Sequence, residues 1–364
     1  MNPRTRGQAW LVLLLLCCLS LPAPAGECDC SACPTEENPT TGTWTLTIGY
    51  DHMDMGTLLQ GSTRVSPTQA ALDGLAANGS PMFVVPTSML MERFVLRARY
   101  ALDERQSIGL SLPQVLNQMD MLMVMAPMPA VGPGMGMPGM GMPMPAAGPT
   151  FRSMTMDPIN QLGDIVLHYS YDVIDESDAR LTLGVGLKTP TGDSQVRDPN
   201  GRLIHAMMQP GSGSWDAVLT ASGRVELDET WAIEPALSYQ LTSRNELGYR
   251  FGNRFGYDLG LRCRVLEPLT LRLDLNGVVT GRDSTDGTLD PGTGTVAYQR
   301  PATSLIDNVQ NTGLSTLYLS PGLTWRIVDE VGVTVQHRIP IARSVNGTQL
   351  VTDGWTQIQL SGSF

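Results

Sequence analysis

Apolar and polar residues alternate with a period of two along twelve segments of the chain, each of about ten residues. In residues 269–280, for example, leucines alternate with Thr270, Arg272 and Asp274. Successive side chains of a β-strand point to opposite faces, so this pattern predicts strands with one apolar and one polar face. The predicted strands are 43–51, 91–101, 106–116, 163–173, 180–189, 214–225, 230–241, 254–265, 269–280, 313–326, 331–340 and 354–364.

The connections between these segments favour a membrane barrel over a soluble sandwich, which would show the same alternation. Short turns such as "LDERQ" and "DESDA" join every second pair of segments, and longer connections join the others. Outer-membrane barrels combine short periplasmic turns with long outer loops, an even strand count and a polar interior. We therefore predict an all-β fold, an antiparallel transmembrane β-barrel of about twelve strands.

Aromatic residues fall where the two membrane interfaces of such a barrel should lie. If the first strand runs outward, the periplasmic rim holds Trp44, Tyr100, Tyr171, Trp231, Trp325 and Phe364. The outer rim then holds Tyr50, Trp215, Tyr239, Phe255 and Trp355. The last segment, "TQIQLSGSF", ends on Phe364 and resembles the assembly signal of outer-membrane barrels. The expected partners are outer-membrane lipids and the barrel-assembly machinery.

The first residues read as a targeting segment. Arg4 and Arg6 precede an apolar run and a small-x-small site, so we predict a secretory signal peptide over residues 1–25. A periplasmic tail containing cysteines would span 26–42, and the barrel 43–364. The net charge of −11 makes nucleic acid an unsuitable partner. Charged residues make up 16%, below the ~25% usual in soluble domains, which agrees with a large lipid-facing surface.

Two outer loops have distinctive sequences. In the predicted loop 52–90, Ser66, Pro67 and Gly79 are start and stop signals of a short helix. The predicted loop 117–162 is rich in Met, Gly and Pro, and nine of residues 121–145 are methionine. Its beginning, "MDMLMVM" (119–125), alternates and is expected to extend the third strand. The remainder is a lid for hydrophobic substrates, a soft-metal site, or a compositional drift with neither role.

Three motifs follow one another in the middle of the chain: "LGDIVLHYSY" (162–171), "LTLGVGLKTPTGD" (181–193) and "GSGSWDAVLTASGRV" (211–225). Together they resemble an outer-membrane transporter family linked to phenol-degradation pathways and distantly akin to long-chain fatty-acid channels. The resemblance covers roughly residues 160–225. It implies a diffusion channel for small hydrophobic or aromatic compounds.

The alternation places Asp164, Lys188 and Asp216 on the lumen side of neighbouring strands, near the outer mouth. Opposite charges at such positions pair, so we expect a cluster that either shapes the entrance or serves only as a structural ion pair. Further lumen candidates are His168, Arg262, Arg264, Arg272 and Asp274. The last four are expected to face one another across a tight turn, either filling the lumen or lining a substrate path.

Enzymatic chemistry has no support, because the chain carries no nucleophile motif and its histidines are scattered. Soft-metal chemistry is the alternative, since clustered thiols and thioethers suit Cu(I). The candidate ligands are Cys28, Cys30, Cys33, His52, Met53 and Met55. The predicted topology puts the cysteines and the other three on opposite sides of the membrane, so they cannot form one site. The cysteines could equally form a disulfide with one spare thiol. The leading hypothesis is a passive channel without a resident cofactor, and the alternative is a copper-binding or export component.

Overall fold

The computed structural model describes residues 25–26, 41–127 and 148–364. The predicted signal peptide up to residue 24, the three clustered cysteines and residues 128–147 of the methionine-rich loop lie outside these residues. Among the described residues, no helix is long and apolar enough to cross a membrane.

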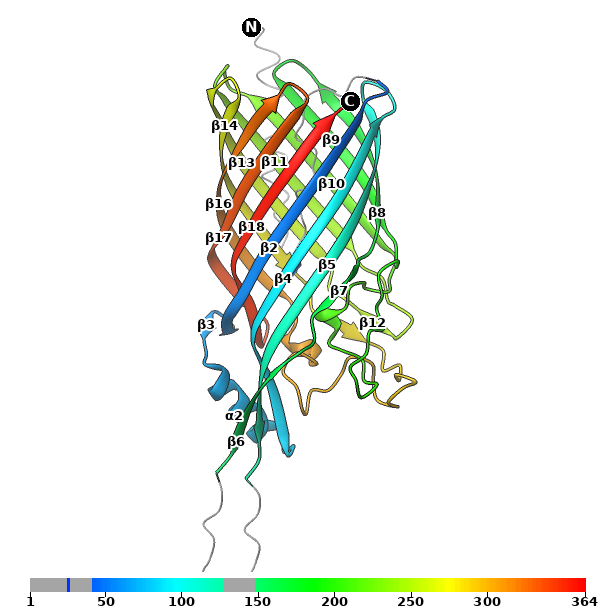
Figure 1. The fold of residues 1–364 in the computed structure, drawn as a ribbon, viewed down its shortest axis with the longest axis vertical. Coiled ribbons are helices and arrows are strands. Elements are labelled where there is room, and N and C mark those ends of the chain that lie inside the picture. Colours follow the sequence, from blue (N-terminus) through cyan, green and yellow to red (C-terminus); the bar gives the residue numbers. More distant parts are fainter. Residues whose placement is uncertain (1–24, 27–40, 128–147) are drawn as a thin grey trace, which may run out of the picture.

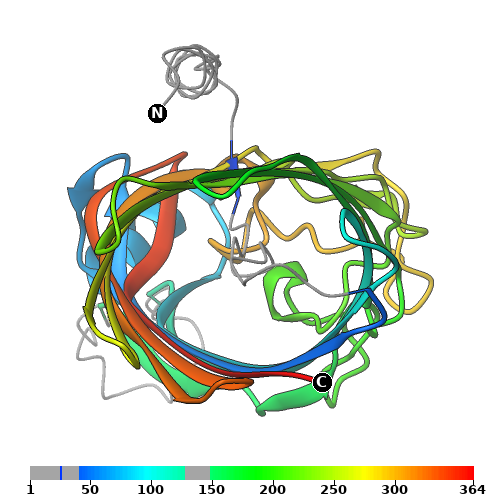
Figure 2. The same cartoon turned by 90° about the horizontal axis from the view of Figure 1, so that it is seen from above.

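Twelve antiparallel strands close a barrel, as the alternation predicted (Figure 1). They are β2 (Trp44–Gln60), β4 (Met82–Ala101), β5 (Gln106–Met125), β8 (Val166–Asp175), β9 (Ala179–Lys188), β10 (Asp216–Glu226), β11 (Trp231–Leu241), β13 (Arg254–Leu266), β14 (Leu269–Thr280), β16 (Leu314–Val328), β17 (Val331–Val345) and β18 (Thr348–Ser363). Each strand pairs with the next along the chain, and β18 pairs with β2 to close the ring. Figure 2 shows the closed ring along the barrel axis.

The shorter elements lie outside this ring of strands or beside its ends. β3 (Thr63–Arg64) pairs with β2, and β6 (Thr150–Thr155) and β7 (Ile159–Leu162) pair with β5. β12 (Tyr249–Arg250) pairs with β15 (Ser284–Thr285), and β1 (Ala25–Gly26) pairs with the end of β14. In the described residues the helical elements are α2 (Pro67–Asn78), η2 (Ala206–Met208) and η3 (Val309–Asn311).

The two faces of β14 illustrate how the alternation becomes a membrane barrel. Leu271, Leu273 and Leu275 point outward with 40–46% of their surface exposed, whereas Asp274 and Asn276 point inward and are buried. The same division recurs around the ring, where the exposed large side chains are mainly Leu, Ile and Val. An apolar outer band around a polar interior is what a barrel in lipid requires.

Three strands at one side extend far beyond the length needed to cross a bilayer. β4 and β5 each have 20 residues and β2 has 17, whereas about 10 tilted residues cross the apolar core. The expected extension of the third strand through Met125 is therefore present. Because β2 runs to Gln60 and β4 begins at Met82, the predicted loop 52–90 shrinks to residues 61–81. That loop contains α2, whose N-cap Ser66 accepts a hydrogen bond from the backbone N–H of Gln69.

The predicted alternation of short and long connections holds except at one place. β17 extends to Val345 and β18 begins at Thr348, so a two-residue turn, Asn346-Gly347, replaces the expected loop 341–353. Gly347 has φ +59°, the left-handed conformation that tight hairpin turns need. The remaining long connections lie at the lower end of Figure 1, opposite the short turns and the C-terminus.

The aromatic rim at the end with the short turns is as predicted. Trp44, Trp231, Trp325 and Phe364 are exposed there, and the rings of Trp44 and Tyr100 lie 4.9 Å apart between centroids. At the opposite rim, Trp215 is exposed but Trp355 is not: only 2% of its surface is accessible. The prediction for Trp355 was wrong because its side chain points into the barrel, where it is held by polar partners described below.

Candidate functional site in the barrel lumen

The outer half of the barrel encloses a cavity of about 520 Å³. Its wall is apolar over much of its area, where Val95, Val115, Val166, Phe251 and Leu350 contribute. Basic and acidic side chains interrupt this surface at a few points, as is usual for sites that bind small apolar ligands. The cavity is also lined by Arg93, Arg97, His168, Lys188, Asp164, Asp216, Tyr249 and Asp283.

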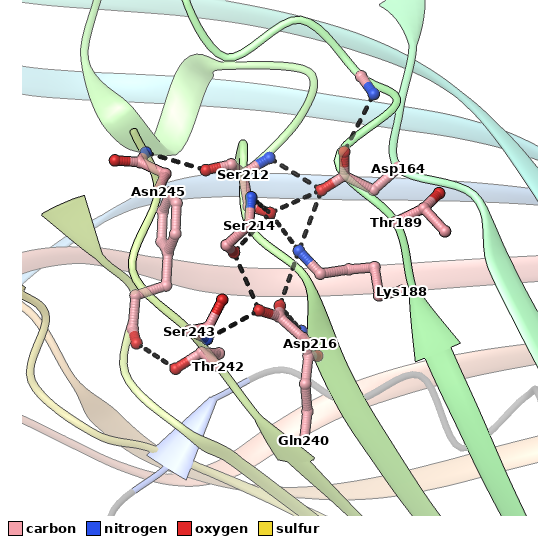
Figure 3. A network of polar contacts seen from close by, with 12 residues as sticks. Asp164, Lys188, Thr189, Ser212, Ser214, Asp216, Gln240, Thr242, Ser243 and Asn245 are labelled. Atoms are coloured by element: carbon pink, nitrogen blue, oxygen red, sulfur yellow. Dashed lines mark hydrogen bonds and ion pairs between the residues drawn. The ribbon is translucent and has the colours of Figure 1, made fainter. Parts of the chain in front are cut away.

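The predicted cluster of Asp164, Lys188 and Asp216 forms at the edge of this cavity (Figure 3). Lys188 Nζ lies 2.7 Å from an Asp216 carboxylate oxygen and 3.0 Å from one of Asp164. β9 and β10 pair Lys188 directly with Asp216. All three side chains are at most 12% exposed. Lys188 is the only lysine in the chain. All other basic side chains except the histidines are arginines, so the compact lysine ammonium occurs only in this cluster.

Serine residues of the "GSGS" motif bind both carboxylates of the cluster. The Ser212 N–H and hydroxyl donate to Asp164 at 2.8 and 2.7 Å, and the Ser214 hydroxyl donates to Asp216 at 2.9 Å. Gln240 Nε2 also donates to Asp216 at 2.7 Å, as does the Ser243 N–H at 3.0 Å. Each carboxylate therefore has several donors besides Lys188 (Figure 3).

The motif glycines allow the three segments to pack against one another at Asp164. A Cβ on Gly192 would lie 2.8 Å from Gly211 Cα and 2.9 Å from the Gly163 carbonyl carbon. A Cβ on Gly211 would lie 2.3 Å from the Gly192 carbonyl oxygen. The spacing requires residues without side chains. The motifs are thus explained as a close backbone contact that encloses Asp164.

His168, another predicted lumen residue, lies on the cavity wall between two glycines of adjacent strands. The register pairs it with Gly109 on β5 and Gly186 on β9. A Cβ on Gly186 would lie 3.0 Å from His168 Nδ1, so the missing side chains provide the space that the imidazole occupies. The ring is therefore positioned as part of the cavity wall.

The half of the lumen nearer the short turns is crossed by a network of buried charges. Arg262 Nε lies 2.6 Å from a Glu234 carboxylate oxygen, and Arg262 Nη1 pairs with Asp274. Asp274 also contacts Gln336, and Arg272 Nη2 lies 3.7 Å from an Asp274 carboxylate oxygen. The side chains of this network line a second cavity of only about 70 Å³. The lumen therefore narrows sharply along its axis.

Arg264 does not join this network, contrary to the sequence expectation. The register pairs Arg262 with Arg272 and Gly260 with Asp274, but it pairs Arg264 with Thr270 at the strand end. Arg264 is exposed there. Its face was inferred correctly, but its position along the axis places it outside the buried charges.

A second polar cluster was missed in the sequence because it centres on Asp51 and Trp355, which were not lumen candidates. Arg93 Nη2 lies 2.7 Å from an Asp51 carboxylate oxygen, and Gln357 Nε2 and Trp355 Nε1 donate to the other oxygen at 2.8 and 3.3 Å. The Arg338 guanidinium stacks 4.0 Å from the centroid of the Trp355 ring. The alternation of β18 could have identified Trp355 as inward, since Ile358 and Leu360 are outward.

Loops 189–215 and 281–313 fold over the mouth of the barrel and are joined by ion pairs (Figure 2). Arg197 contacts Asp290 at 2.6 Å, and this hydrogen bond lowers the pKa of Asp290 to about 2. His205 Nδ1 lies 2.6 Å from Asp307.

Closer to the cavity, the Tyr249 hydroxyl donates to Asp283 at 2.6 Å. Burial raises the pKa of Asp283 to about 6. The loops thus present both an apolar surface and a titratable carboxyl to the cavity.

The predicted metal ligands do not come together. His52 lies within β2 and points outward, where its ring contacts Glu92 and Asp54, whereas Met53 and Met55 are buried on the inner face. Neighbours in sequence on a strand face opposite ways. In the part of the chain that the structure describes, no group of three or more His, Cys, Asp or Glu residues is arranged to hold a metal. Cys28, Cys30 and Cys33 lie outside that part.

Comparisons with known proteins agree with this architecture. The fold is similar to the crystal structure of an outer membrane channel from Pseudomonas putida F1, with 14% identity, coverage of 93% of this chain and 100% of that chain, and a TM-score of 0.56. More distant similarities include a Ralstonia pickettii toluene transporter (9% identity, 90% of both chains, TM-score 0.39) and a Pseudomonas aeruginosa FadL homologue (10% identity, 89% of this chain and 90% of that chain, TM-score 0.36). No curated protein matches the chain. 

A family model provides the assignment that the structural similarities alone do not. The model described as "Putative MetA-pathway of phenol degradation" matches residues 147–336, which is just over half of the chain. This match extends well beyond residues 160–225, where the motifs were recognised, and it includes the whole Asp164, Lys188 and Asp216 cluster. The fold is that of a bacterial outer-membrane β-barrel, and the chain belongs to the family of the MetA pathway of phenol degradation.

Proposed function

We propose that the protein is a passive outer-membrane channel for small hydrophobic or aromatic compounds. The observation that supports this most directly is the outer cavity of about 520 Å³ with its largely apolar wall. An apolar cavity of ~150 Å³ is sufficient to bind benzene, so the outer cavity has room for a monoaromatic compound.

The second cavity limits passage of any solute along the barrel axis. Its volume of about 70 Å³ holds a few water molecules but no benzene ring. Arg262, Glu234 and Asp274 surround it and are held by one another. A molecule that enters the outer cavity therefore meets a charged constriction, and passage along the axis requires this network to rearrange.

Uptake into proteoliposomes tests the proposal, with toluene as the hydrophobic probe and glucose as the polar one. We expect the protein to accelerate toluene transfer and to leave glucose transfer near the rate of protein-free vesicles. Equal acceleration of both probes, or of neither, would contradict a channel selective for hydrophobic compounds.

Paired tryptophan variants distinguish the lumen from the lipid face. Val115→Trp with Val218→Trp narrows the cavity from two strands, because both valines line it. Leu116→Trp with Leu219→Trp adds the same bulk one residue further along, on the opposite face of each strand. We expect the first pair to slow toluene transfer at least several-fold and the second pair to have little effect.

We also propose that the end of β18 is the contact with the barrel-assembly machinery, and that residues 1–25 are removed after export. The Phe364 N–H donates to the Trp44 carbonyl, and the Trp44 N–H donates back, both at 2.9 Å, while the Phe364 side chain is exposed. Deleting Phe364 should lower the amount of folded barrel in the outer membrane. Phe364→Tyr, which keeps an aromatic end, should assemble normally.

A further inference from the structure

Five methionines form a patch on the inner face of three neighbouring strands, which we call the methionine patch. Met53 and Met55 lie on β2, Met89 and Met91 on β4, and Met119 on β5. The register pairs Met53 with Met91, Met55 with Met89, and Met89 with Met119. Met53, Met55, Met89 and Met119 are buried, at 1–8% exposure.

The spacing of the patch allows several thioether sulfurs to approach one point. Residues directly opposite on paired antiparallel strands have Cβ atoms ~4.5–5.5 Å apart. A methionine carries its sulfur two bonds beyond Cβ on a flexible stem. Met89 is paired on both sides and precedes Met91 by two residues on the same face, so β4 provides the centre of the patch.

The methionine sulfurs differ in their existing hydrogen bonds and in their access from the cavity. The Thr352 hydroxyl donates to Met53 Sδ at 3.4 Å. Met55 and Met91 line the outer cavity and can be reached from it. The nearby Arg93 is paired with Asp51 at 2.7 Å, which offsets the positive charge that would otherwise oppose a cation beside Met91.

We propose that Met55, Met89 and Met91 bind a soft monovalent cation, Cu(I) or Ag(I). Thioethers are neutral, polarizable ligands that favour such ions, whereas hard cations require oxygen ligands. The site is reached through the outer cavity, and it differs from the sequence expectation because His52 and the cysteines take no part. The inference does not depend on the proposed channel function.

Silver binding to the full-length protein in detergent tests the site, because Ag(I) is stable in air. All six cysteines of the chain are replaced by Ser, and the methionines of 128–147 by Leu, so that the counted ions come from the described barrel. Bound silver is measured by equilibrium dialysis in chloride-free buffer with elemental mass spectrometry. We expect one ion per chain.

The decisive variant is Met89→Leu with Met91→Leu, which keeps apolar volume and removes the central sulfurs. Strands are ~4.8 Å apart, so the methionines left on β2 and β5 are separated by an intervening strand. We expect silver affinity to fall at least tenfold while the melting temperature in detergent stays close to that of the starting protein, because leucine keeps the apolar packing.

Met82→Leu with Met125→Leu is the matched control, since these residues are also paired across β4 and β5 but lie at the far strand end. Silver affinity should be unchanged in this control. Absence of saturable binding in the starting protein, or equal affinity in the Met89/Met91 variant, would overturn the site. Loss of toluene transfer in the starting protein would contradict the proposed channel function but not the silver site, because silver binding is measured independently.

Discussion

Replacing Lys188 with Met is the most direct test of the cluster at the outer mouth. The change removes the ammonium that lies 2.7 Å from Asp216 and 3.0 Å from Asp164 and leaves two buried carboxylates without it. Removing one partner of a buried ion pair typically costs ~3–5 kcal/mol. The lower end applies here, about 3 kcal/mol, because Ser212, Ser214 and Gln240 still donate to the carboxylates.

The free energy of unfolding in detergent, measured by denaturant titration with tryptophan fluorescence, gives this value. Lys188→Met combined with Asp216→Asn should recover part of the loss, since one uncompensated charge is removed. A single variant within about 0.5 kcal/mol of the parent, which is the size of an ordinary surface substitution, would refute the reasoning. So would a double variant that is no more stable than the single one.

Single-channel conductance of the same variant separates the two roles left open for the cluster. A changed current in folded Lys188→Met protein would show that the cluster shapes the entrance. Loss of stability with an unchanged current would show that it is a structural ion pair.

Three further predictions follow from the site. Arg262→Gln should raise single-channel conductance by opening the constriction, whereas Arg264→Gln, on an exposed arginine of the same strand face, should not. Burial raises the pKa of Asp283 to about 6, so the folded protein holds this proton more tightly than the unfolded chain does. The free energy of unfolding should therefore fall as the pH rises from about 4 to 6. Asp283→Asn should abolish this pH dependence, measured as the melting temperature at several pH values. Gly192→Ala should lose ~1–3 kcal/mol through overpacking against Gly211, measured against Gly332→Ala, whose added Cβ has no contact closer than 3.7 Å.

The strands were predictable because the lipid-facing side chains repeat at every second position. In β14 the predicted range 269–280 coincides with the strand. The outer ends of β2 and β4 were not predicted, because beyond the membrane both faces of these strands are covered and apolar residues no longer alternate with polar ones. Phe83 and Val124, for example, are buried together on the face opposite the methionines. The outer end of β5 was predicted, because "MDMLMVM" (119–125) keeps a period of two.

The turn between β17 and β18 could have been found from the sequence. Asn346-Gly347 is a strong signal for a two-residue hairpin, but the expectation of alternating long loops outweighed it. The cluster of Asp164, Lys188 and Asp216 was found because two of its members are register partners on adjacent strands. Ser212 and Asn245, which complete it from the loops, carry no periodic signal.

Alternation determines which face a side chain occupies but not its position along the barrel axis. The outer cavity and the charged constriction of this lumen lie at different positions along that axis. Arg262 and Arg264 share a face, yet one is buried among carboxylates and the other is exposed beyond them. Position along the axis depends on the stagger between paired strands, which all twelve pairings determine together. The wide outer cavity and the narrow charged constriction are therefore properties of the closed barrel, and only the assembled register separates them.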